Sequence, residues 1–125
     1  MVIVDTSVWI EAFRKSGQRE IKERVAELLQ NDEARFCDPV LLELKNSLPR
    51  ENEREKLLSL IALVPILPTT ALCWQRAGDY AQILRKKGVS VPVIDLLIRA
   101  VADENRAKCF SVDSDFAQIE KMLDL

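Results

Sequence analysis

Residues 2–7 read V-I-V-D-T-S, three β-branched residues followed by an aspartate, a threonine and a serine. The apolar run predicts a short buried strand over Val2–Val4, and the polar residues after it predict the start of a helix over Ser7–Arg14. The threonine or the serine can cap that helix, which leaves Asp5 free to point outward from the end of the strand. A strand that passes directly into a helix is the basic unit of α/β folds.

Similar short β-rich runs recur along the chain and alternate with segments of helical periodicity. Further strands are predicted at Arg35–Cys37, Val64–Leu67 and Cys109–Val112. Further helices are predicted at Glu20–Gln30, Pro39–Ser47, Glu51–Ala62, Ala71–Lys87, Val93–Asn105 and Phe116–Met122. Because strands that alternate with helices pair in parallel through right-handed crossovers, this order predicts a single domain over residues 1–125. The expected architecture is a three-layer α/β/α sandwich around a mostly parallel sheet of four or five strands.

The composition excludes several classes of protein. Forty-eight per cent of the 125 residues are hydrophobic and only three are glycine, which indicates a folded core rather than a disordered chain. No apolar run approaches the ~20 residues of a membrane span, and the first residues lack the features of a signal peptide. We therefore expect a cytoplasmic protein. The net charge of −2 argues against a plain RNA-binding module, but it suits an enzyme whose bound cations face phosphates.

The absence of histidine narrows the possible chemistry further. It rules out Ser-His-Asp and Cys-His nucleophiles and histidine-based acid–base cleavage of RNA. Cys37, Cys73 and Cys109 are far apart and form no C-x-x-C pair, so we expect small buried hydrophobic side chains rather than a zinc site. A hydrolase with this composition must use carboxylates, lysines or a metal held by oxygen ligands.

Aspartates follow three of the four predicted strands. Ligands of open parallel sheets bind beyond the carboxyl ends of the strands, where Asp5, Asp38 and Asp113 stand. Asp38 precedes a proline and is fully explained as a helix cap. Asp113 and Asp115 would repel each other unless one caps the next helix or a cation lies between them. With Asp115 as the cap, Asp113 is left for the cleft.

Two further acids lie on predicted helices. Glu43 borders the apolar side of its helix and is weak evidence alone, since an isolated helical glutamate is usually solvated. Asp95, Arg99 and Asp103 are spaced four residues apart on one face of V-I-D-L-L-I-R-A-V-A, which is apolar almost all round. That polar face either meets water, with an Asp95–Arg99 surface pair, or lines a cleft. The residues alone leave both alternatives open.

Four motifs together resemble those of PIN-domain ribonucleases, specifically the VapC-type toxins of toxin–antitoxin pairs. The motifs are M-V-I-V-D-T-S-V-W-I, P-V-L-L-E-L, V-I-D-L-L-I-R-A-V-A and F-S-V-D-S-D-F, in the family's order from Met1 to Phe116. The resemblance implies an endoribonuclease that uses Mg²⁺ or Mn²⁺. Its implied catalytic acids are Asp5, Glu43, Asp95 and Asp113, with Asp5, Asp95 and Asp113 as metal ligands and Ser7, Ser111 and Asp115 in auxiliary roles.

The resemblance also implies partners. The family cleaves RNA, usually acts as a homodimer and is silenced by a small cognate antitoxin, whose basic side chain we expect in the carboxylate cleft. Trp9 and Phe13 lie four apart on one helix face and are interpreted as core or subunit-interface positions. Arg99 stands where the family most often has a small residue, so it could pair with Asp95, contact RNA or change what fits the cleft. The family's usual final strand is expected to be short or missing here.

Two alternatives to the nuclease remain at this stage. One is a non-catalytic PIN-like module that acts only through protein contacts, although the presence of all four acids argues against it. The other is a phosphotransfer domain of the receiver or haloacid-dehalogenase type. The dehalogenase type needs D-x-D at the end of the first strand, where the third residue here is Ser7. A receiver needs an acid after the third strand, where Pro68 and Thr69 follow.

Overall fold

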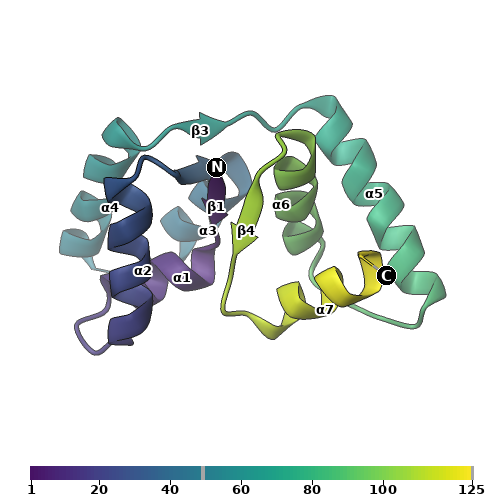
Figure 1. The fold of residues 1–125 in the computed structure, drawn as a ribbon, viewed down its shortest axis with the longest axis horizontal. Helices are drawn as coiled ribbons and strands as arrows, with labels where there is room; N and C mark the ends of the chain where they lie inside the picture. Colours follow the sequence, from purple (N-terminus) through teal and green to yellow (C-terminus); the bar gives the residue numbers. More distant parts are fainter. Residues whose placement is uncertain (49, 125) are drawn as a thin grey trace.

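The four predicted strands form one parallel sheet (Figure 1). The computed structural model describes residues 1–48 and 50–124 of the chain. Its strands are β1 (Val2–Val4), β2 (Ala34–Cys37), β3 (Ile66–Leu67) and β4 (Lys108–Phe110). The strand order is β3-β2-β1-β4, and Ile3 pairs with Arg35 on one side and Cys109 on the other. β1 is therefore a central strand whose carboxyl end lies beside that of β4.

Seven helices in the described residues connect or follow the strands. They are α1 (Thr6–Phe13), α2 (Arg19–Gln30), α3 (Asp38–Ser47), α4 (Glu51–Leu63), α5 (Ala71–Lys86), α6 (Val93–Glu104) and α7 (Ser114–Leu123). Figure 1 shows α2 and α4 toward one end of the molecule and α5 and α7 toward the other. The element order is the predicted one, and the predicted α/β/α sandwich is confirmed. Between residue 1 and residue 124 the sheet has four strands, the lower of the two expected numbers.

The hydrophobic core surrounds β1. Ile3 and Val4 are fully buried, and Trp9 on the first turns of α1 is 1% exposed. The Trp9 ring lies 5.0 Å from the ring of Phe36 and 6.0 Å from that of Phe13, measured between centroids. Trp9 is therefore a core residue, which confirms the first of its two predicted roles and excludes the subunit interface for it. Phe13, further along the helix, remains half-buried.

α6 passes through the core as its composition predicts. Its buried apolar residues are Leu96, Leu97, Ile98, Ala100, Val101 and Ala102. Asp95 in the first turn is buried with them, at 6% exposure. None of the helices in the described ranges is long and apolar enough to cross a membrane.

Candidate active site

Asp5 ends β1 and is almost completely buried, at 3% exposure. Its backbone N–H donates to the Phe110 carbonyl at 2.9 Å, which ties the end of β1 to β4. Asp5 occupies the N-cap position of α1, but its side chain makes no capping hydrogen bond. Instead Asp5 Oδ2 accepts hydrogen bonds from Ser7 Oγ at 2.7 Å and Ser111 Oγ at 2.9 Å. The two serines therefore orient the carboxylate, and the expectation that Thr6 or Ser7 caps the helix is wrong.

The second oxygen of Asp5 has no partner. Oδ1 is buried, and no donor in the described part of the chain lies within hydrogen-bond distance. A buried carboxylate oxygen without a donor is costly, and native proteins avoid it unless a ligand or ion completes the site. Asp5 thus presents one fixed oxygen and one unsatisfied oxygen at the carboxyl end of the sheet.

Glu43 on α3 faces the same point. Thr6 Oγ1, from the residue after Asp5, donates to Glu43 Oε1 at 2.8 Å. Glu43 is half-buried, so the interpretation of a solvated surface glutamate is wrong. Burial raises the pKa of the Glu43 carboxyl, the Thr6 hydrogen bond opposes this rise, and the charge of Asp5 adds to it.

The sequence does not identify the positioning role of Thr6. Its place directly after the strand-end aspartate predicts only a possible helix cap. The residue that it orients is 37 positions away in the chain, so no local pattern could have identified the pair.

Asp95 enters the site from the first turn of α6. It has no ion pair within residues 1–48 and 50–124, because Arg99 pairs instead with Asp103 at 3.0 Å and Asp124 at 2.6 Å. Of the two alternatives predicted for this helix face, the Asp95–Arg99 surface pair is therefore wrong. Burial first, and then repulsion from Asp5 and the other neighbouring carboxylates, raises the pKa of Asp95 from 3.8 to about 7.

Asp113 and Asp115 approach from the start of α7. Asp113 is the N-cap, and its Oδ1 accepts a hydrogen bond from the Asp115 backbone N–H at 2.9 Å. The predicted cap is therefore wrong, since Asp113 rather than Asp115 caps the helix. The Asp113 backbone N–H donates to Ser111 Oγ at 3.0 Å, and this turn ends β4 at Phe110 instead of the predicted Val112.

The acids converge into two overlapping groups. Ligand oxygens of Asp5, Glu43 and Asp95 lie within 4.8 Å of one another, and so do those of Asp95, Asp113 and Asp115. Asp95 belongs to both groups. Carboxylates at this separation repel strongly when ionised, and a cation among them would remove that cost. An oxygen-only donor set suits Mg²⁺ or Mn²⁺.

Three other sequence features lie outside this cluster. Asp38 is exposed at the start of α3, where Cys37 is the N-cap, and its side chain makes no capping bond, so its assignment as a cap is wrong. Arg99 is held by its two ion pairs and joins neither group of acids. Burial raises the pKa values of the Cys37 and Cys109 thiols to about 12, in agreement with the expected small hydrophobic role.

Sequence comparison places this architecture in a known family. The PIN domain family model matches residues 2–122. A VapC ribonuclease from Mycobacterium bovis and ribonuclease VapC11 from Mycobacterium tuberculosis are each 31% identical over 129 residues. Each alignment covers 100% of this chain and 96% of the relative.

Solved structures share the fold at lower identity. FitAcB from Neisseria gonorrhoeae superposes with a TM-score of 0.80 at 18% identity, covering 96% of this chain and 94% of the other. The structure of VapBC2 from Rickettsia felis bound to a DNA fragment from its promoter superposes with a TM-score of 0.79 at 23% identity. The match covers 98% of this chain and 96% of the other. The family match over almost the whole length, together with the acids at the carboxyl edge of a β3-β2-β1-β4 parallel sheet, shows that this chain belongs to the PIN domain family.

Proposed function

We propose that this chain is a metal-dependent endoribonuclease and the toxin of a type II toxin–antitoxin pair. The observation that carries the proposal is the convergence of Asp5, Glu43 and Asp95 within 4.8 Å. It is supported by the two full-length relatives, which are named ribonucleases. Membership of the PIN domain family excludes the receiver-like and dehalogenase-like alternatives.

The acid cluster fits Mg²⁺ or Mn²⁺ on two grounds. Asp5 Oδ1 is buried and finds no hydrogen-bond donor among residues 1–48 and 50–124, and Asp95 is buried among carboxylates that oppose its ionisation. A divalent cation would bind the unpartnered oxygen of Asp5 and would offset the repulsion that opposes ionisation of Asp95. We assign Asp5, Asp95 and Asp113 as its direct or water-mediated ligands. Because Asp95 is common to both groups, the second group, with Asp115, offers a place for a further cation.

The chain's own residues would orient the reacting groups. A bound cation lowers the pKa of a water ligand and offsets charge on the attacked phosphate. Ser7 and Ser111 hold Asp5 through its Oδ2. Thr6 holds Glu43 through a hydrogen bond, and we assign Glu43 to orient the attacking water or accept its proton, or to help bind a second cation. Since water attacks, and not the ribose 2′-hydroxyl, the products carry a 5′-phosphate and a 3′-hydroxyl.

The proposed function is tested by cleavage of RNA with the purified, antitoxin-free chain. We expect cutting with Mg²⁺ or Mn²⁺ and none in excess chelator, and Asp5→Asn or Asp95→Asn should lower the rate by orders of magnitude. Asp79→Asn is the matched control, because Asp79 is exposed on α5 and makes no hydrogen bond or ion pair in the described ranges. Undiminished cleavage in chelator would contradict the metal mechanism. Complete inactivity towards RNA would favour the non-catalytic module.

We further propose that the protein acts in the cytoplasm as a homodimer. The most exposed large apolar side chains of α5 and α6 are Leu72 (59%), Trp74 (62%) and Val93 (76%), and this surface rather than Trp9 is our candidate for the subunit contact. A small antitoxin would silence the enzyme by placing a basic side chain among the carboxylates. A strict monomer in sedimentation, with growth arrest unaffected by co-expression of any small antitoxin-like reading frame found next to the gene, would contradict these two proposals.

A further inference from the structure

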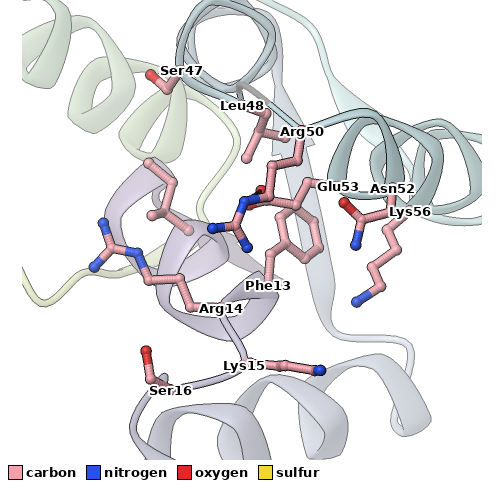
Figure 2. Close-up of a pocket in the computed structure, with 11 residues that line it drawn as sticks. Phe13, Arg14, Lys15, Ser16, Ser47, Leu48, Arg50, Asn52, Glu53 and Lys56 are labelled. Carbon is pink, nitrogen blue, oxygen red and sulfur yellow. Dashed lines mark ion pairs between the residues drawn. The ribbon is translucent and has the colours of Figure 1, made fainter.

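A cavity of about 660 Å³ lies at the opposite end of α1 from the acid cluster (Figure 2). Its walls come from the end of α1 and the loop after it, the end of α3, and the start of α4. Four of the residues that line it are cationic and one is acidic: Arg14, Lys15, Arg50, Lys56 and Glu53. Phe13 lines the same cavity, and Figure 2 shows its ring among these side chains.

The cations of this cavity are poorly neutralised. Arg50 lies 3.8 Å from Glu53, and Arg14 lies 3.9 Å from Glu11, so both ion pairs are long, and both arginines are exposed. Lys15 and Lys56 make no ion pair in the part of the chain that the structure describes. The chain as a whole carries a net charge of −2. A local excess of cations around a cavity therefore indicates an anionic ligand.

The loop that carries Lys15 is held in place. Lys22 Nζ donates to the Ala12 carbonyl at 2.8 Å and also to the Arg14 carbonyl. A Cβ atom on Gly17 would lie 1.9 Å from the backbone oxygen of Glu11, so only glycine allows this close approach. The loop is thus fixed against α1 and α2, which lowers the entropic cost of binding a ligand there.

The cavity and the acid cluster are joined by two helices. Thr6 lies at the cluster and Phe13 at the cavity, and at ~1.5 Å per residue they are about 10 Å apart along α1. Glu43 and Ser47 are likewise separated by one turn of α3. A polymer bound at the acid cluster can therefore reach the cavity.

We propose that this cavity binds the backbone of the RNA substrate a few nucleotides away from the scissile phosphate; this inference rests on the proposed function. Lys15 and Lys56 contact phosphates, and the half-buried ring of Phe13 offers a stacking surface for a base. A nucleotide supplies both an anionic phosphate and the π face of a base. The cavity offers cations for the first, and the apolar lining residues Ile10, Phe13 and Leu48 for the second. RNA is favoured over an acidic protein segment because the cavity lies along α1 from the cluster proposed to cut RNA.

The test compares two double variants in the inactive Asp95→Asn background. Lys15→Gln with Lys56→Gln removes two cavity cations, whereas Lys86→Gln with Lys121→Gln removes two exposed, unpaired cations of the described chain outside the cavity. Binding of a labelled, unstructured RNA oligonucleotide is measured by fluorescence anisotropy in Mg²⁺ at several salt concentrations. The cavity variant should bind roughly tenfold more weakly, and its log–log salt slope should fall by about 1.4 for two lost phosphate contacts. The control pair should behave as the parent does.

Two further measurements sharpen the interpretation. In the otherwise wild-type protein, the cavity variant should raise KM for RNA and leave kcat and the melting temperature unchanged, because both lysines are exposed and distant from the acids. RNA affinity and salt slope equal to those of the control pair would overturn the proposal. Retained RNA binding with loss of the antitoxin would also overturn it and assign the cavity to a protein partner. If the parent binds no RNA and the wild type cuts none, the proposed function fails as well, which is a distinguishable result.

Discussion

Replacement of Asp95 by asparagine should stabilise the metal-free protein at neutral and alkaline pH. Asp95 is 6% exposed and belongs to both groups of carboxylates. Its pKa is raised from 3.8 to about 7 by burial and by the neighbouring acids. At about 1.4 kcal/mol for each pH unit by which a pKa moves, the ionised Asp95 lowers the free energy of unfolding by at most about 4 kcal/mol. Relaxation of the neighbouring carboxylates will reduce the observed value.

The dependence on pH has a definite sign. Below about pH 4 Asp95 is protonated in both the folded and the unfolded chain and contributes no difference. Between about pH 4 and pH 7 the unfolded chain releases the proton first, so the stability of the metal-free wild type falls as the pH rises. The asparagine side chain of the variant does not titrate, so the free energy of unfolding of the variant does not fall with pH for this reason. The gain from Asp95→Asn should thus be near zero at about pH 4 and largest above about pH 7.

Metal should reduce the stability advantage of the variant over the wild type. A cation present at 100 times its Kd stabilises the wild type by about 2.7 kcal/mol, and the variant, which lacks a ligand, should gain less. Urea unfolding of both proteins at about pH 4.5 and pH 8, with and without Mn²⁺, measures their free energies of unfolding and how these depend on pH and on metal. Asp79→Asn should leave the free energy of unfolding within about 0.5 kcal/mol of wild type. A metal-free Asp95→Asn protein clearly less stable than wild type, together with a wild type indifferent to Mn²⁺, would refute the cluster.

Three further changes test individual contacts. Thr6→Val removes the hydrogen bond that opposes the raised pKa of Glu43, so the acidic limb of the kcat/KM profile should move to higher pH; an unchanged profile would exclude Glu43 as the proton acceptor. Gly17→Ala should lower the free energy of unfolding by about 1–3 kcal/mol, measured in urea, because its Cβ would overlap the Glu11 carbonyl. Arg99→Gln breaks two ion pairs and should cost about 1–3 kcal/mol while KM for RNA stays constant. A raised KM would instead assign Arg99 to an RNA contact.

Much of the fold was predictable because it depends on neighbours in the chain. The periodicity of apolar residues identified all four strands and seven helices of the described ranges, with small errors at their ends. The alternation of strands and helices then determined the parallel sheet, since a right-handed crossover leaves few other arrangements. Asp5 was identified as a site residue for the same reason, because a strand-end aspartate lies at the edge where α/β proteins bind ligands.

The roles within the site depend on distant contacts and could not be predicted locally. A side-chain oxygen can cap a helix or face a cleft with the same sequence around it, and the sequence-based choice between Asp113 and Asp115 was wrong. Arg99 has acids four residues away on both sides, Asp95 and Asp103, yet it pairs with Asp103 and with Asp124 near the end of the chain.

The elements, their order and the types of residue available for chemistry (carboxylates and hydroxyls, without histidine) can all be inferred from the order of residues along the chain. Which of these groups meet depends on how the chain folds. Ser111 reaches Asp5 across 106 positions, and the two groups of acids draw on α3, α6, α7 and the end of β1. This is because hydrogen bonds and charge repulsion act over a few ångströms in space, whereas periodicity and capping act over a few residues along the chain.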